Sequence, residues 1–229
     1  MPASDNIVSL NSLNLRGASI LFILTFVLAL SPARADIQGT PIDSLPVAEK
    51  VALREGQPYL TEISEGSYVA RIVVRAPLEK VWEVITDYNA YQEFLPNVTS
   101  SQIVAVDGNQ KTLEQISVAR VLLFNIEART LSLIEENSNM QRLDFRLLEG
   151  DLEVSQGSWV LEPYALEWGA PMDRILLTYS IEIDPGKTFS RAIFYKVFEE
   201  AIPNTLSAIS AEISRRSENS VEIQTQPMN

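Results

Sequence analysis

Hydrophobic and polar residues alternate along much of the chain, beginning with the segment "YVARIVVRA". The alternation places Ala70, Ile72 and Val74 on one face and Arg71 and Arg75 on the other, as in a strand with one buried side. Similar runs follow and are separated by the turn signals "DGN", "ENSN" and "EGD". Together they predict one antiparallel sheet of about seven strands, with a buried face and a wet face.

The pattern changes to a helical period in two places, and the first comes directly after the first strand. Pro77 can occupy the first turn of a helix, where its missing N–H costs nothing. Val81, Trp82 and Ile85 then share an inner stripe, and we expect the helical segment to end before Pro96.

The second helical pattern is the longest in the chain and runs from Thr188 to about Arg216. Its predicted inner stripe consists of Phe194, Val197, Phe198, Ala201, Leu206 and Ile209. Pro203 lies inside this pattern, so either two helices meet there, with Asn204 starting the second, or one helix acts as a lid that opens at a kink. The element order predicts an α+β fold, in which a curved antiparallel sheet wraps on a long C-terminal helix, with one or two short helices after the first strand.

The first residues have the pattern of a secretory signal peptide. An uncharged apolar run from Ala18 to Leu30 precedes the small-residue triplet "ARA", which ends at Ala35. The run is shorter than the roughly 20 residues of a membrane-spanning helix. We predict export after cleavage of residues 1–35, to the periplasm, the thylakoid lumen or the exterior. An uncleaved short anchor or a core helix are the alternatives.

The remaining chain divides into three parts. We assign residues 36–66 to an extended arm that has one helix-like patch, "SLPVAEKVALREG". Residues 67–216 form the folded domain, and residues 217–229 are predicted to be a flexible tail.

Composition excludes several classes of function. Eighteen Lys and Arg against thirty Asp and Glu give a net charge of −12, which repels phosphate backbones, so we expect no nucleic-acid partner. The chain has no Cys and no His, which removes thiol nucleophiles, disulfides, Ser-His-Asp triads and the usual zinc ligands. We therefore predict no metal, no cofactor and no assigned catalytic residue. Any acid–base chemistry has to use carboxylates, Lys or Tyr.

Several segments, in their order along the chain, resemble a known family. They are "APLEKVWEVITDYNAYQEFLPNV", "EGD" followed by "GSWVLEP", "LLTYSIEIDP" and "VFEEAIPNTLSAI". The chain resembles the polyketide cyclase/dehydrase branch of the START-like (SRPBCC, helix-grip) superfamily, and looks closest to its coenzyme Q-binding START-domain group. The resemblance covers about Ser67 to Ser214. It implies a deep, mostly apolar cavity between the sheet and the C-terminal helix, which holds a lipid, quinone, polyketide or similar molecule.

The resemblance, together with the apolar stripes, implies a set of ligand-binding side chains. These candidates are Trp82, Tyr91, Phe94, Phe124, Phe145, Trp159, Tyr179, Phe198, Ile202 and Leu206.

Some candidates have a second interpretation. Trp159 either stacks on a flat ligand or packs in the core, and the Tyr179 hydroxyl needs a polar partner from a ligand or from the backbone. Tyr88, Tyr91 and Phe94 either gate the cavity or plug the corner after the helix.

The carboxylates that lie within predicted strands also have two interpretations. They are either solvated outer-face groups or a buried pair that transfers protons. These residues are Glu114, Glu127, Asp144 and Glu153.

Three hypotheses for function follow. The leading hypothesis is an exported binding or carrier protein for a hydrophobic small molecule, such as a lipid or a prenylquinone. A transient contact with a membrane accompanies this hypothesis, and the oligomeric state is left open. The alternatives are a polyketide cyclase or dehydratase without metal or histidine chemistry, and a protein-interaction module.

Overall fold

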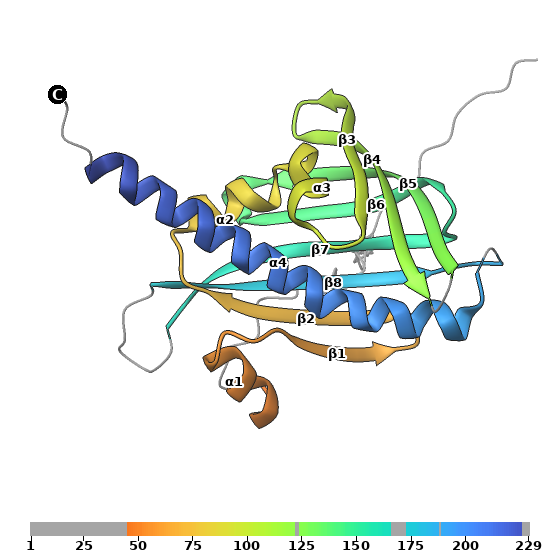
Figure 1. Cartoon of the computed structure of the whole chain (residues 1–229), viewed down its shortest axis with the longest axis horizontal. Helices are drawn as coiled ribbons and strands as arrows, with labels where there is room; N and C mark the ends of the chain where they lie inside the picture. The colour runs from red at the N-terminus through yellow and green to blue at the C-terminus, as the bar shows by residue number, and fades with distance from the viewer. Residues whose placement is uncertain (1–44, 122–123, 166–172, 188, 226–229) are drawn as a thin grey trace, which may run out of the picture. The chain divides into compact units, whose positions relative to one another are not determined.

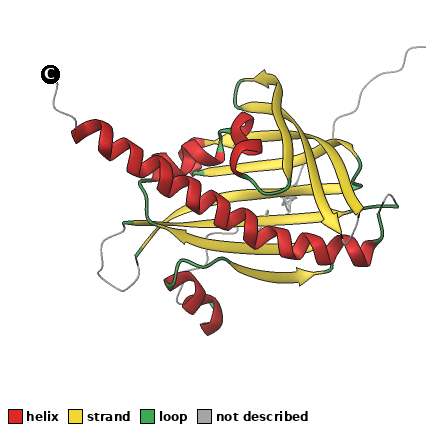
Figure 2. Cartoon of the chain, in the orientation of Figure 1, coloured by secondary structure: helices red, strands yellow, loops and turns green. Residues whose placement is uncertain are grey.

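One antiparallel sheet forms the body of the molecule. The computed structural model describes residues 45–121, 124–165, 173–187 and 189–225 of the chain, so the predicted signal peptide lies outside the described residues. The eight strands follow the order β1-β2-β8-β7-β6-β5-β4-β3. Their bounds are β1 (Tyr59–Ser64), β2 (Ser67–Val74), β3 (Val98–Asp107), β4 (Gln110–Val121), β5 (Phe124–Asn137), β6 (Arg142–Gly150), β7 (Val154–Tyr164) and β8 (Arg174–Asp184). The predicted α+β fold is confirmed (Figure 2).

The topology is simple, because the strands from β3 to β8 each pair with the next strand along the chain. Strand β2 then pairs with β8, which places the first two strands at the opposite edge from β3. Inward and outward positions alternate as the sequence predicted. Ile72 and Val74 of β2 lie in the main core with Leu177 of β8.

The segment assigned to an arm differs from the extended linker that the sequence indicated. Helix α1 (Val47–Arg54) lies within the predicted helix-like patch, but the segment also contains strand β1, which pairs with β2. Because β1 is an edge strand whose burial falls from half-buried to exposed along its length, it lacks the alternation that marks the other strands. The sheet therefore begins at Tyr59 and has one strand more than the predicted seven.

Helix α1 is fixed to the face of the sheet opposite the main core. Arg71 Nη1 donates a 2.6 Å hydrogen bond to Glu49 Oε1, whose residue is only 2% exposed. Leu45 and Leu53 pack beside this ion pair against Val73. A buried carboxylate needs such a partner, because an unpaired buried charge is strongly destabilising.

Four helical segments complete the molecule on the inner side of the sheet. They are α2 (Leu78–Ile85), the 3₁₀ turn η2 (Tyr88–Ala90), the short helix α3 (Tyr91–Phe94) and the long helix α4 (Arg191–Thr225). Figure 1 shows α4 crossing the sheet, with α2 and α3 beside it, and these helices contact one another.

Helix α4 is continuous through Pro203, so two separate helices do not meet there. Proline removes one backbone hydrogen bond from the helix. Around it, the side chains of Asn204 and Thr205 donate to the carbonyls of Glu200 (2.9 Å) and Ala201 (3.0 Å). The helix also continues past Arg216 to Thr225, where the sequence predicted a tail. Residues beyond Arg216 carry few apolar side chains, so the periodic signal ends before the helix does.

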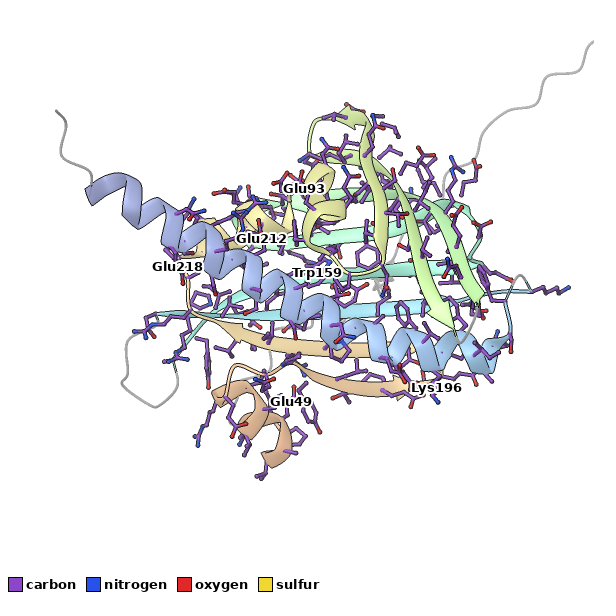
Figure 3. All side chains as sticks on the ribbon, in the orientation of Figure 1. Glu49, Glu93, Trp159, Lys196, Glu212 and Glu218 are labelled. Carbon is purple, nitrogen blue, oxygen red and sulfur yellow. The ribbon has the colours of Figure 1, made fainter. Side chains whose placement is uncertain are left out.

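The C-terminal half of α4 is held by an ion-pair network. Arg216 contacts Asp87 at 2.9 Å and lies over the ring of Phe94, while both Arg215 and Arg216 donate to Glu212 at 2.6 to 2.7 Å. Glu212 is labelled on α4 in Figure 3, and this residue is only 7% exposed. The network fastens α4 to the corner that follows α2.

Edge strand β3 is covered along its first half by the same corner. The backbone N–H of Ser101 donates to Gln92 Oε1 (3.0 Å) and that of Ile103 donates to Asn89 Oδ1 (2.8 Å). The Ser101 hydroxyl donates to the carbonyl of Tyr88 (2.6 Å). These side chains occupy backbone donors that an edge strand otherwise leaves unpaired.

Candidate functional site

A cavity of about 310 Å³ lies between the inner face of the sheet and helix α4. Ligand pockets in proteins usually measure roughly 300–1,000 Å³, so this cavity is at the small end of the range. It is bounded by β4 to β8, by the N-terminal part of α4 and by the corner that contains η2 and α3. The predicted position of the cavity, between sheet and C-terminal helix, agrees with the structure.

One part of the wall is a row of stacked aromatic rings on β6, β7 and β8. The rings of Trp159 and Tyr179 are stacked with centroids 4.2 Å apart, and Phe145 stacks on Tyr179 at 5.9 Å. Trp159 is labelled in Figure 3 on the sheet beneath α4. Gly157 makes this row possible, because a Cβ there would approach Phe145 to 2.9 Å and the Ser180 carbonyl to 2.0 Å. The missing side chain leaves room for the rings.

Helix α4 supplies a second aromatic row. Phe194 and Phe198 are one helical turn apart and lie parallel, with ring centroids 5.8 Å apart. Phe189, just before the helix, stacks on Phe194 at 5.9 Å. All three rings line the cavity. Large, flat and rigid surfaces of this kind bind apolar molecules at a low cost in side-chain entropy.

Strands β4 and β5 form a wall of different chemistry. Their inward positions are occupied mainly by small or uncharged polar side chains. The cavity-lining residues on these strands are Leu113, Gln115, Ser117, Val118, Ala119, Ile126, Ala128, Thr130, Ser132 and Ile134. Because many of these side chains are small, they leave space beside the sheet unfilled. This space is part of the cavity.

Three tyrosines mark the polar features of the cavity. Tyr88 donates a 2.7 Å hydrogen bond to Glu136, which also accepts from Lys111 at 2.5 Å. Tyr91 donates to the carbonyl of Ile85 at 2.5 Å.

The third tyrosine, Tyr179, differs from the other two. Its hydroxyl makes no hydrogen bond to any residue that the structure describes. Burial raises the pKa of all three tyrosine hydroxyls well above the ordinary value, so they hold their protons at neutral pH. The Tyr179 hydroxyl is therefore a neutral hydrogen-bonding group that faces the cavity.

No Asp, Glu, Lys or Arg lines the cavity within the described part of the chain. The carboxylates considered as a proton-transfer pair lie elsewhere: Glu114 pairs with Arg129, Asp144 pairs with Arg142, and Glu127 and Glu153 are exposed. Over the same residues, no cluster of three or more His, Cys, Asp or Glu is placed to hold a metal ion.

The predicted ligand-binding residues fall into three groups. Tyr91, Phe145, Trp159, Tyr179 and Phe198 line the cavity. Phe124 begins β5, and its side chain lies outside the described residues.

Trp82, Phe94, Ile202 and Leu206 do not line the cavity and instead belong to or pack against the main core. On α4 the reason is geometric. Ala201 and Thr205 face the cavity, whereas Ile202 and Leu206 lie on the adjacent stripe of the helix, about 100° further round. An apolar stripe therefore does not by itself separate core from cavity.

Sequence reasoning missed the polar positions on β4 and β5. A signal was available in "TLEQISVA", because Gln115 and Ser117 are in phase with Leu113, which marks the inward face. Polar residues in phase with an apolar strand face indicate either a hydrated cavity or an error in the predicted phase.

Comparison with known proteins gives the family. A model of the family described as polyketide cyclase / dehydrase and lipid transport matches residues 74–210, more than half of the chain. The chain belongs to this family. A search of curated proteins found no match.

Solved structures show the same fold. An aromatase/cyclase, Zhui from Streptomyces sp. R1128, is 17% identical with a TM-score of 0.53, over 66% of this chain and 94% of that one. A START superfamily protein from Mycobacterium smegmatis is 14% identical with a TM-score of 0.54, over 65% and 97%. A STAR-related lipid transfer protein from Xanthomonas axonopodis is 17% identical with a TM-score of 0.53, over 69% and 98%.

The family and the cavity together support a domain that binds a hydrophobic ligand. Among the described helices, none is both long enough and apolar enough to cross a membrane. The finer resemblance to the coenzyme Q-binding group stays a prediction.

Proposed function

We propose that this protein is an exported carrier that binds a hydrophobic small molecule, such as a lipid or a prenylquinone, and releases it chemically unchanged. One observation carries the proposal: the described lining of the cavity combines two rows of aromatic rings with no charged side chain. Most of the affinity then comes from apolar area removed from water, at about 25 cal/mol per Å² before the costs of association.

The same observation argues against cyclase or dehydratase chemistry. Proton transfer needs a group whose pKa lies near the working pH. Burial raises the pKa of Tyr88, Tyr91 and Tyr179, which makes each a weaker acid and keeps it neutral. A neutral tyrosine orients a ligand by hydrogen bonding without accepting its proton.

Export and a transient membrane contact complete the proposal. Support for export comes from the uncharged run that ends before "ARA", and the proposed mature chain starts at Asp36. The net charge of −12 disfavours lasting adhesion to an anionic bilayer, which suits brief contacts during transfer. The intact mass of protein from its native host tests export, and retention of residues 1–35 on a soluble protein would contradict it.

A transfer assay with Tyr179→Phe tests the carrier function. The protein is expected to move a fluorescent quinone or lipid analogue between vesicles and to release it unaltered. Because Tyr179 donates to no described residue, removing its hydroxyl costs the ligand at most one ordinary hydrogen bond, about 0.5 to 1.5 kcal/mol. We expect transfer to weaken by no more than about tenfold.

Tyr195→Phe is a matched control for this assay. It removes a tyrosine hydroxyl outside the described cavity lining, where that hydroxyl accepts a 3.0 Å hydrogen bond from Arg191. Mass spectrometry of the recovered analogue decides between binder and enzyme. A cyclised or dehydrated product formed over repeated turnovers, and lost in Tyr179→Phe, would establish the cyclase alternative instead.

A further inference from the structure

Four polar side chains of β4 and β5 form one continuous patch on the cavity wall. Gln115 of β4 lies directly opposite Thr130 of β5, and Ser132 lies opposite Leu113 on the next inward step. Ser117 is the next inward residue after Gln115 on β4. Side chains directly opposite or diagonal across an antiparallel pair are close enough to contact a common molecule.

This patch has little hydrogen bonding of its own. Gln115 Nε2 makes a long contact of 3.4 Å with the Ser117 hydroxyl, and neither the Thr130 nor the Ser132 hydroxyl bonds to another described residue. All four side chains are half-buried and face the cavity. Their hydrogen-bonding capacity is therefore directed at whatever fills the cavity.

A saturated hydrocarbon chain is a poor occupant of such a wall. Each polar group that loses water without gaining a partner costs about 1–3 kcal/mol. A buried methylene contributes only about 0.8 kcal/mol, so several methylenes are needed to offset one unsatisfied hydroxyl. A ligand that presents oxygen atoms to the patch avoids this cost.

The neighbouring wall favours a flat ligand. Strand β6 separates the patch from β7 and β8, where Trp159 and Tyr179 expose stacked rings to the same cavity. The volume of about 310 Å³ is at the small end of the range for ligand pockets, which suits a fused-ring molecule better than a lipid with two acyl chains.

We propose, on the basis of the carrier function above, that Gln115, Ser117, Thr130 and Ser132 determine specificity. They select a flat conjugated molecule with carbonyl or hydroxyl oxygens along one edge, and they discriminate against a saturated acyl chain. The oxygen-bearing edge is held by the β4 and β5 patch, and the ring face lies on the aromatic row.

Calorimetric titration with matched probes tests this proposal. The probes are 2-methyl-1,4-naphthoquinone, 2-methylnaphthalene, which has the same ring system without oxygens, and dodecanoic acid. The quinone is expected to bind at least about tenfold more tightly than either other probe, the effect of one or two net hydrogen bonds. Thr130→Val combined with Ser132→Ala should reduce that preference about tenfold, because the double variant binds the quinone more weakly and binds the hydrocarbon as before.

Thr112→Val is the matched control, because Thr112 does not line the cavity and lies on β4 in the phase opposite to Leu113, Gln115 and Ser117. It should leave the preference unchanged. If the double variant melts below the parent, Thr130→Val alone, which keeps the side-chain shape, is used.

Equal affinity for the quinone and the hydrocarbon, or a preference that survives loss of the hydroxyls, would overturn the proposed specificity and leave the carrier function standing. Failure of all three probes to bind would overturn the carrier function as well.

Discussion

The two halves of the sheet are both antiparallel, but their inward-facing side chains differ in size and polarity. On β2 and β8, the inward positions hold residues such as Ile72, Val74 and Leu177, which pack tightly against α2 and α4. On β4 and β5, the equivalent positions hold Ser117 and Thr130 among others, which face open space. The difference shows that side-chain size and polarity at the inward positions, and not strand pairing, decide where the core ends and the cavity begins.

Helix α4 shows the same contrast along its length. Its N-terminal part places Phe194 and Phe198 on the cavity, where both remain partly accessible. Its C-terminal part buries Ile213 almost completely and is held by the Glu212 network. The N-terminal part of the helix thus lines the cavity, and the C-terminal part fixes the helix to the rest of the fold.

The largest effect on stability is expected where α4 packs in the main core with β2 and β8. Leu206 is 0% exposed, so Leu206→Ala should lower the free energy of unfolding by about 2–5 kcal/mol, through lost burial and a residual cavity. Urea denaturation measures this loss. Leu206→Met conserves the volume and should cost less than about 1.5 kcal/mol. A Leu206→Ala variant that unfolds like the parent would show that this half is not tightly packed.

A smaller effect on stability is expected from the ion pairs of Glu212 that hold α4 in place. Hydrogen bonds from Arg215, with a further contribution from Arg216, hold the pKa of Glu212 at about 2, below its ordinary value of 4.5. Because the folded-state pKa is depressed, the stabilisation is complete above about pH 4.5 and is lost as pH falls toward 2. Glu212→Gln should lower the unfolding free energy by about 1–3 kcal/mol at pH 7.

Denaturation between pH 3 and pH 7 checks the sign of this effect. The difference between parent and Glu212→Gln should shrink as the pH falls from 5 to 3. Glu218→Gln, at an exposed carboxylate further along α4 (Figure 3), should show no such dependence. A difference that is constant across this range would mean that the carboxylate charge of Glu212 does not provide the anchorage.

The smallest effect on stability is expected from the open half. Ser132 faces the cavity, so Ser132→Leu extends into free space and should change the unfolding free energy by about 1 kcal/mol or less. The same change should abolish binding of the quinone probe, because the new side chain occupies the volume of the ligand. A loss well above 1 kcal/mol would place Ser132 in a packed environment and would remove the contrast between the two halves.

Much of the fold was predictable from local patterns. Alternation identified several of the strands from β2 to β8, and the helical period identified the main part of α4, because in these elements burial follows the phase of the sequence. Strand β1 and the C-terminal end of α4 were missed for one reason. Strand β1 becomes exposed along its length, and residues 217–225 of α4 include few apolar residues, so neither segment carries a periodic apolar signal.

The cavity was less predictable than the fold. Trp159 and Tyr179 were found because large aromatics on an inner strand face are conspicuous, whereas Leu206 was assigned to the site although it packs in the core. Sequence phase places a side chain on the inner side but does not say whether a neighbour fills the space beside it. That depends on the curvature of the sheet and on small residues such as Gly157, whose role appears only when β6 and β8 are placed around it.

The covering of edge strand β3 has a consequence for how this protein can change over evolutionary time. Asn89 and Gln92, which occupy the β3 backbone donors, belong to the same short corner as the cavity tyrosines Tyr88 and Tyr91. An uncovered edge strand is a template for intermolecular sheet growth. Variants that reshape this corner to accept a new ligand therefore also risk exposing an aggregation-prone edge. Substitutions that change the backbone of this corner are therefore disfavoured by aggregation. Substitutions in the polar patch on β4 and β5 do not carry this cost.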